Sequence, residues 1–142
     1  MNELNAKPAL AAAKALLESA QLPVSDLTEQ HCEHFFYCGS AERLAGLVGL
    51  ELFGDVALLR SLVVTPDARS SGMGTALVQH AEMQARARGV KAVYLLTTTA
   101  EVFFARRGYK KVQRDAAPQA IRITREFADI CPASSAFMSK QL

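Results

Sequence analysis

Hydrophobic residues recur with a helical period at the start of the chain and in extended runs after it. Pro8 can occupy the first turn of a helix, and apolar residues then follow at spacings of three and four, at Leu10, Ala13, Leu17 and Ala20. The pattern predicts a helix to about Ala20, ended by Pro23. An aromatic run over residues 35–38, followed by glycine and serine, predicts a strand and a turn.

Two longer apolar segments, residues 43–53 and 56–64, are joined by Gly54 and Asp55, a pair typical of tight turns. They predict an antiparallel hairpin of two central strands. Helical and extended patterns then alternate, with glycine or proline at most boundaries. We predict a helix from Met73 to Gly89, a strand over 90–97, a short helix over 100–107, a strand from about Tyr109, a helix from Pro118 to about Ala128 and a last strand over 134–140. This order indicates an α/β fold with a mixed sheet.

Length and composition limit the class of protein. A chain of 142 residues, 50% apolar and 21% charged, predicts one globular domain over residues 1–142. The formal net charge is +2 and no basic stripe stands out, so we expect no nucleic-acid partner. Charges interrupt the first twenty residues, which lack the apolar run of a signal peptide or membrane span. We therefore expect no membrane contact and a cytoplasmic location.

Three cysteines without a CxxC motif argue against a disulfide framework and fit a reducing compartment. On one extended strand, Cys32 and Cys38 would lie roughly 20 Å apart, too far to share a metal ion. We predict that both are buried small residues and that the chain has no metal site. Cys131 has no histidine nearby in sequence to activate it as a nucleophile, so we also predict a structural thiol there.

A loop with two glycines separates the strand that ends at Val64 from the helix that begins near Met73. It reads Arg69-Ser70-Ser71-Gly72-Met73-Gly74. Unpaired N–H groups at a helix N-terminus bind anions, and with Arg69 nearby they predict a pyrophosphate site. A plain strand-to-helix turn is the alternative. No Gly-Lys-Ser/Thr follows, and Leu77 replaces the third glycine of a dinucleotide motif, which disfavours a nucleoside triphosphate or NAD.

The R-x-x-G-x-G element, with Leu62-Val63-Val64 and Pro66 before it, resembles the coenzyme A loop of the GNAT acetyltransferases. Residues 103–109 resemble the family's later helix and the start of its next strand. Within the family, residues 94–101, 124–127 and 131–134 most resemble the arsenic-resistance N-acetyltransferases, and the acetyltransferase domain of N-acetylglutamate synthases is more distantly similar. The resemblance implies a mostly antiparallel sheet with splayed central strands and flanking helices, acetyl-CoA as cofactor, a small-molecule amine substrate and, as is common in the family, a homodimer.

The resemblance also implies the coenzyme contacts. The strands carrying residues 62–64 and 94–97 would splay apart, so that the pantetheine arm pairs with the backbone of Leu62 and Val64. A backbone N–H in the same strand would stabilise the oxyanion. The full set of expected coenzyme-binding residues is Leu62, Val63, Val64, Arg69, Ser70, Ser71, Gly72, Met73, Gly74, Thr75 and Phe104.

The amine must lose a proton, so a carboxylate or an ordered water should accept it. Glu51, at the end of the strand paired with the coenzyme strand, is the leading candidate, and a solvated edge-strand carboxylate is the alternative. Glu101 and His80 are weaker candidates. Many relatives have tyrosine at the position of Phe104, so the residue that would protonate the thiolate is missing; Tyr94 and Tyr109 are either substitutes or packing residues.

Arg60 lies inside an apolar strand, two residues before Leu62 and, by the period of a strand, on the same face. By analogy with glutamate synthases it would bind an amino-acid carboxylate; an internal pair with a glutamate is the alternative. Arg122 and Arg125 carry the same two alternatives. Thr97, Thr98 and Thr99 are expected to line the acceptor pocket; the alternative is plain β-structure with a helix cap at Thr99.

The motifs and the resemblance together predict an acetyl-CoA-dependent N-acetyltransferase that acts on an amino acid or a glutamate-like analogue. The resemblance also implies that this activity is linked to arsenic resistance. Soft trivalent arsenic would need clustered thiolates, whereas Cys32, Cys38 and Cys131 are scattered, so an organic acid analogue fits better. A non-catalytic acyl-CoA-binding sensor or regulatory subunit is the alternative, and a purely structural domain ranks below both.

Overall fold

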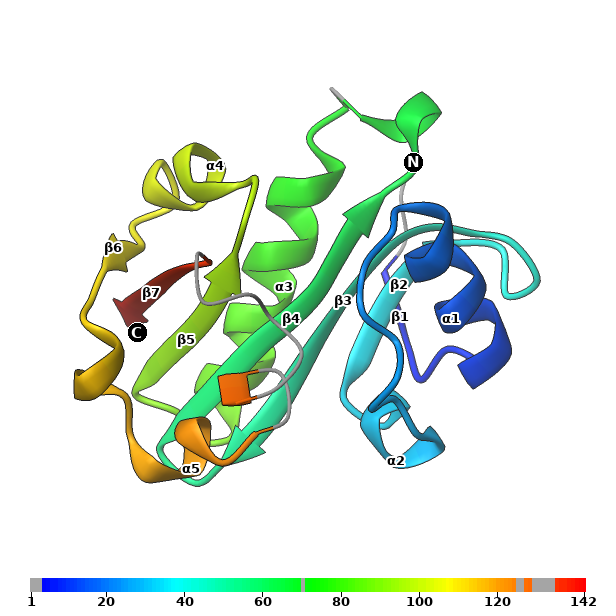
Figure 1. Cartoon of the computed structure of the whole chain (residues 1–142). Helices are drawn as coiled ribbons and strands as arrows, with labels where there is room; N and C mark the ends of the chain where they lie inside the picture. Colours follow the sequence, from blue (N-terminus) through cyan, green and yellow to red (C-terminus); the bar gives the residue numbers. More distant parts are fainter. Residues whose placement is uncertain (1–3, 70, 125–126, 129–134) are drawn as a thin grey trace.

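The computed structural model describes residues 4–69, 71–124, 127–128 and 135–142. Its strands form one sheet in the order β1-β2-β3-β4-β5-β7-β6 (Figure 1). In chain order they are β1 Asn5–Ala6, β2 Phe35–Gly39, β3 Leu44–Phe53, β4 Val56–Val64, β5 Ala92–Thr97, β6 Lys110–Lys111 and β7 Ala136–Gln141. Neighbours are antiparallel except β4 and β5, which are parallel. The predicted mixed, mostly antiparallel sheet is confirmed.

The helices are α1 Leu10–Ser19, α2 Glu29–Cys32, α3 Met73–Ala87, α4 Glu101–Ala105 and α5 Gln119–Arg122. The predicted first helix, the hairpin β3–β4 and the helix after the glycine loop are confirmed. Strand β1 and helix α2 were not predicted, because two and four residues are too short for a periodic pattern. Within the described residues no helix combines the length and the apolar character needed to cross a bilayer.

The late helix predicted from Pro118 to about Ala128 is wrong in extent, because α5 ends at Arg122. The hydroxyl of Thr124 donates to the carbonyl of Ile121 at 2.7 Å, a local bond that competes with continued helix. Residues 127–128 are in π-helical conformation. The strand predicted from Tyr109 is the two-residue β6, and the last strand begins at Ala136.

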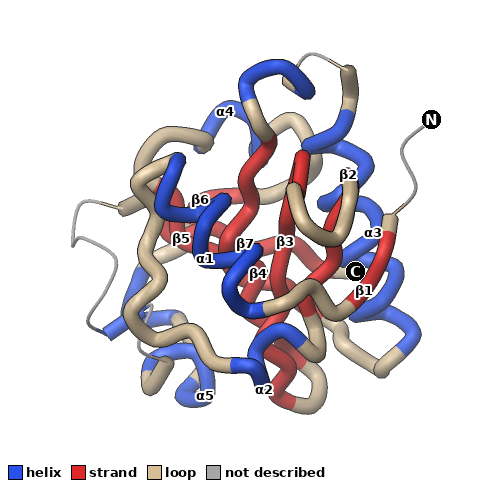
Figure 2. Tube along the Cα trace, turned by 90° about the vertical axis from the view of Figure 1, so that its right-hand side faces the viewer, coloured by secondary structure: helices blue, strands red, loops and turns tan. Residues whose placement is uncertain are grey.

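Helix α3 covers one face of the sheet. Its apolar residues recur at helical spacing and are buried against the sheet's inward side chains: Met73, Leu77, Val78, Ala81 and Ala85 pack with Leu50, Ala57, Leu59, Val93 and Leu95. The tube in Figure 2 shows α3 and α1 on opposite sides of the strands. The burial of α3 fixes its N-terminus beside the end of β4.

Two smaller clusters cover the other face. Helices α1 and α2 pack over β2 and β3 through Ala13, Leu16, Leu17 and Cys32. Helix α5 packs over the opposite part of the sheet, where Ile121 meets Leu58 and Phe137. Arg60, between these clusters in the middle of β4, is a buried charge on this face.

Candidate active site

Strands β4 and β5 pair only at one end. Hydrogen-bonded register runs from Val56 opposite Ala92 to Leu58 opposite Tyr94, and no pairing follows. The remaining residues of β4 therefore present backbone groups that β5 does not use. The predicted splay of the central strands is confirmed.

A β-bulge accompanies the splay. Gly49 of β3 pairs with Arg60 and Leu47 pairs with Val63, so Val48 is opposed by two residues, Ser61 and Leu62. Ser61 has φ of +60°, a left-handed conformation that is uncommon for a residue other than glycine. Bulges bend a strand and increase its twist, which turns β4 away from β5.

The bulge overturns the expectation that Arg60 and Leu62 share a face. Gly49 and Leu47 lie two residues apart on one face of β3, so their partners Arg60 and Val63 share a face as well. Leu62 packs toward the α3 side. The extra residue shifts the two-residue period by one, and a strand pattern alone does not reveal this.

The predicted glycine loop forms one wall of a cleft of about 560 Å³. Gly72 precedes α3 with φ of +82°, a conformation that favours glycine. A Cβ atom on Gly74 would lie 3.3 Å from the ring of Phe103, so this glycine allows close packing against α4. Eight predicted coenzyme residues line this cleft: Leu62, Val63, Val64, Arg69, Gly72, Met73, Gly74 and Thr75.

Two predicted coenzyme residues do not line this cleft. The hydroxyl of Ser71 donates to the carbonyl of Ala68 at 2.6 Å and so stabilises the turn. Phe104 is buried and lines the neighbouring cleft instead. Ser70 lies outside the described residues, as do Arg125 and Cys131.

Two guanidinium groups flank the N-terminus of α3. Arg69 donates from Nε to the carbonyl of Val64 at 3.1 Å. Arg107, which no sequence motif marked as a ligand, lies over the ring of Phe103 at 3.8 Å and donates to the hydroxyl of Thr75 in the first turn of α3. Both line the cleft, so positive charge gathers beside the free N–H groups of the helix.

A central cleft of about 400 Å³ adjoins the first and shares Leu22, Leu62, Thr99 and Ala100 with it. It reaches through the opening between the strands, and Thr97 and Thr98 line it as expected. The expected helix cap at Thr99 is corrected: the hydroxyl of Thr97 accepts the N–H of Ala100 at 2.9 Å. Thr97 therefore already fixes the start of the α4 turn.

Of the two alternatives for Arg60, the structure shows the internal ion pair, and it involves two carboxylates, Asp26 and Glu51. Its side chain has no exposed surface; Nη1 lies 2.5 Å from Asp26 Oδ2 and 2.7 Å from Glu51 Oε2, and Nη2 lies 2.8 Å from Asp26 Oδ1. Burial alone would raise the pKa of Asp26, but the hydrogen bonds and charge of Arg60, with His31 nearby, hold it below its ordinary 3.8. The other oxygen of Glu51, Oε1, accepts no hydrogen bond from the described residues.

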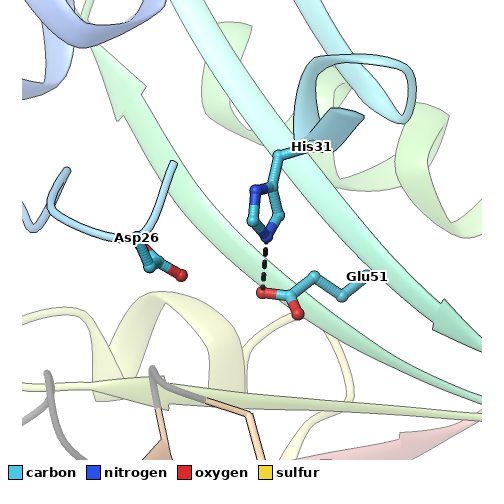
Figure 3. Close-up of side chains that lie close together, drawn as sticks. All are labelled: Asp26, His31 and Glu51. Atoms are coloured by element: carbon cyan, nitrogen blue, oxygen red, sulfur yellow. Dashed lines mark ion pairs between the residues drawn. The ribbon is translucent and has the colours of Figure 1, made fainter. Parts of the chain in front are cut away.

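His31 of α2 completes this cluster (Figure 3). Its Nε2 lies 3.9 Å from Glu51 Oε2, and the donor atoms of Asp26, His31 and Glu51 all lie within 4.8 Å of one another. That spacing resembles a metal site, but the guanidinium of Arg60 already bridges the two carboxylates. The cluster is thus a buried ion-pair network with a histidine at its edge.

The other candidate groups have structural contacts. Tyr109 is buried and donates to Glu82 at 2.9 Å; burial and that carboxylate raise its pKa far above the usual value. Tyr94 stacks on Phe137. His80 meets the ring of Phe36 edge-on at 4.9 Å and lies on α3. Glu101 pairs with a lysine on the surface. None of these groups is placed for proton transfer in the central cleft.

Local contacts also account for Arg122 and the described cysteines. Arg122 donates from Nε to the carbonyl of Ala117 at 3.1 Å. Cys32 and Cys38 are buried free thiols, and burial raises the pKa of both. Their predicted role as small buried residues is confirmed, although they lie on α2 and β2 rather than on one strand.

The model of the acetyltransferase (GNAT) family matches residues 7–113, which is more than half of the chain. This chain belongs to the GNAT acetyltransferase family. Membership agrees with the expected enzyme class, N-acetyltransferase, and with acetyl-CoA as the expected cofactor.

Two relatives illustrate the range of similar sequences. The chain is 32% identical over 93 residues to an uncharacterized N-acetyltransferase of Chlorobaculum tepidum. The matched residues cover 65% of this chain and 59% of that protein. It is 38% identical over 64 residues to the amino-acid acetyltransferase of Ralstonia nicotianae. Here the matched residues cover 45% of this chain and 14% of that protein. The chain therefore spans only part of both relatives.

Solved structures confirm the GNAT fold. N-acetylglutamate synthase from Neisseria gonorrhoeae, complexed with coenzyme A and N-acetyl-glutamate, aligns with a TM-score of 0.81 at 22% identity over 100% of this chain and 35% of that one. A Mycobacterium tuberculosis protein in complex with CoA and NLQ aligns with a TM-score of 0.78 at 17% identity over 99% of both chains.

Proposed function

We propose that this protein transfers the acetyl group of acetyl-CoA to the amine of a small metabolite, an amino acid or a glutamate-like analogue. The observation that carries the proposal is the opening between β4 and β5, which joins the glycine-loop cleft to a cleft where Arg60 and three threonines stand among apolar side chains. Similarity to amino-acid acetyltransferases supports the class of acceptor.

The cleft at α3 suits the coenzyme. The first N–H groups of α3 have no partner within the helix, and together with Arg69 and Arg107 they offer directed donors and positive charge to a pyrophosphate. Beyond Leu58, the backbone of β4 offers hydrogen bonds to the amides of a pantetheine arm, through Leu62 and Val64. The bound coenzyme supplies the activated acetyl group.

The opposite side of the opening suits the acceptor. A backbone N–H near the bulge at Ser61 stabilises the negative charge that develops on the thioester oxygen as the amine attacks. Glu51 accepts the proton that the amine loses, directly or through one water, while Arg60 holds its other oxygen at 2.7 Å. In this proposal Arg60 positions Glu51, and Thr97 and Thr98 contact the acceptor.

The departing thiolate needs no acid from this chain. Phe104 lines the central cleft without a hydroxyl, and Tyr109 is committed to Glu82. A thiol with a pKa of about 8.5 is a tolerable leaving group near neutral pH. We therefore propose that the thiolate leaves without general-acid catalysis.

The test follows free thiol and acetylated product when the protein is mixed with acetyl-CoA and a panel of amino acids. The resemblance to arsenic-resistance N-acetyltransferases adds the phosphinic and arsinic analogues of glutamate to that panel. We expect release of thiol matched by N-acetyl product, and a kcat about 10²–10⁴-fold lower for Glu51→Gln with unchanged affinity for coenzyme A. Glu42→Gln makes the same change in charge at an exposed residue and should keep full activity.

One result would contradict acetyl transfer, and another would contradict only the role of Glu51. Tight binding of acetyl-CoA with no thiol release by any acceptor would favour the acyl-CoA-binding sensor. Normal turnover by Glu51→Gln would leave transfer intact and remove Glu51 as the base.

A further inference from the structure

Backbone strain is concentrated at the central cleft. Three described residues other than glycine have a left-handed backbone, Lys7, Gln21 and Ser61, each with φ of +60°. This conformation is unfavourable for a residue with a Cβ atom, and strained residues gather at functional sites. Gln21 and Ser61 both line the central cleft, whereas Lys7 lines neither that cleft nor the glycine-loop cleft. The bulge in β4 accounts for Ser61, and the conformation of Gln21 has a different origin.

Gln21 ends helix α1. It follows the C-cap residue Ala20, and its N–H donates to the carbonyl of Glu18 at 3.0 Å. The N–H of Leu22 donates to the carbonyl of Leu17, also at 3.0 Å. These two bonds form a Schellman motif, in which the left-handed position is usually glycine. Glycine would relieve the strain of this turn, so the strain points to a role for the side chain that glycine lacks.

The side chain of Gln21 is available to a ligand. Gln21 lines the central cleft but not the glycine-loop cleft, and the next residue, Leu22, lines both. Gln21 therefore lies on the acceptor side, close to the boundary between the clefts. Its carboxamide makes no hydrogen bond with another residue of the described ranges. Two N–H donors and one carbonyl acceptor can thus bond a small molecule in the cleft.

The charged residue of the central cleft is already engaged. Among the described residues that line this cleft, Arg60 is the one with a charge. Its guanidinium contacts the carboxylates of Asp26 and Glu51, and its Nε donates to the hydroxyl of Ser61 at 3.2 Å. Its charge is thus balanced within the protein before an acceptor enters. The other polar side chains in the lining are the amide of Gln21 and hydroxyl groups, so recognition there falls to uncharged hydrogen-bonding groups.

We propose that Gln21 determines acceptor specificity by donating a hydrogen bond from its carboxamide to the carbonyl group next to the acceptor's amine. An uncharged donor bonds a carboxylate or a carboxamide, so the acceptor class includes α-amino amides as well as α-amino acids. This inference rests on the proposed function, because it states how the acceptor of that reaction is held.

The test uses L-glutamate and its α-amide, L-isoglutamine, as acceptors for the wild-type chain, Gln21→Ala and Gln21→Gly. Both variants lose the carboxamide, but alanine keeps the strained backbone and glycine relieves it. We expect the wild-type KM for isoglutamine to lie within about tenfold of that for glutamate, since hydrogen bonds to charged and uncharged groups differ by about that much. Each variant should raise the KM for both acceptors about tenfold and leave the affinity for coenzyme A unchanged.

Thermal unfolding separates the side chain from the turn. Gln21→Gly should raise Tm by up to about 4 °C, whereas Gln21→Ala should leave it unchanged. Lys7→Gly is the matched control, because it relieves the same φ away from both clefts. It should shift Tm as Gln21→Gly does and keep the wild-type KM values. A raised KM in Gln21→Gly but not in Gln21→Ala would assign the effect to the turn and overturn the inference. Weaker binding of coenzyme A with a lower Tm in both variants would also overturn it.

Calorimetric titration of both acceptors into the protein–coenzyme A complex distinguishes this inference from the proposed reaction. Binding of both that weakens about tenfold in Gln21→Ala, without any turnover, would support the role of Gln21 while the reaction fails. Turnover that is indifferent to both variants would overturn the role of Gln21 and leave acetyl transfer standing. A wild-type chain that binds glutamate but not isoglutamine, or that binds neither, would overturn the inference.

Discussion

The two sides of the opening between β4 and β5 are built in different ways. The proposed coenzyme side comes mainly from one continuous stretch, residues 62–75, with Arg107 beside it, and would act mainly through backbone groups at the end of a strand and the start of α3. The proposed acceptor side relies on side chains from a loop, α2, β3 and β4, in the cluster of Asp26, His31, Glu51 and Arg60; of these four, Arg60 alone lines the central cleft. A backbone site can be recognised in a short stretch of sequence, whereas a site of side chains from distant segments depends on the fold.

The largest expected effect is a loss of stability when the ion-pair cluster of the proposed acceptor side is broken. Arg60→Ala leaves Asp26 and Glu51 facing each other without their cation, which should lower the free energy of unfolding by about 3–5 kcal/mol. Urea unfolding followed by circular dichroism measures this change. Lys7→Ala removes an exposed pair with Glu33 at 3.6 Å and should change stability by less than about 1 kcal/mol. Similar values for the two variants would show that the buried cluster adds no special stability.

The next effect concerns the coenzyme side. Gly72→Ala puts a side chain at φ of +82°, so the turn must shift, and affinity for coenzyme A should fall about tenfold as donors to the pyrophosphate move. Gly89→Ala is the matched control, because Gly89 follows the same helix with φ of +86° and equally open space around it. Calorimetric titration should show normal affinity for Gly89→Ala. Equal losses for both variants would point to general strain rather than to a coenzyme site.

The smallest effect is the response of the acceptor side to pH. Because Arg60 lowers the pKa of Asp26, this carboxylate stabilises the fold above its ordinary pKa of 3.8, and the stabilisation is lost as pH falls through the lower native value. The difference in urea midpoint between the wild-type chain and Asp26→Asn should be full at pH 6 and should shrink as the pH is lowered below 3.8. A constant difference across that range would exclude the ion pair as its source.

The sequence patterns anticipated the elements that local rules control. The turn pair Gly54-Asp55 predicted the hairpin, and Gly72 and Gly74 marked the start of α3. The bulge at Ser61 was missed because serine is no signal for a left-handed residue, and this error put Arg60 on the wrong face.

Asp26 and His31 were missed for another reason. Neither belongs to a motif, and only the packing of α1 and α2 over β3 brings them to Arg60 and Glu51. Such contacts belong to the folded chain and leave no pattern in the sequence.

The central claim is that the splayed end of β4 and the start of α3 form the coenzyme site. Amide hydrogen exchange with and without coenzyme A, followed by mass spectrometry, tests it most directly. We predict slower exchange in peptides covering residues 60–64 and 71–76, and no change in β1, β2 or β6. Protection elsewhere, or none at saturating coenzyme A, would contradict the account.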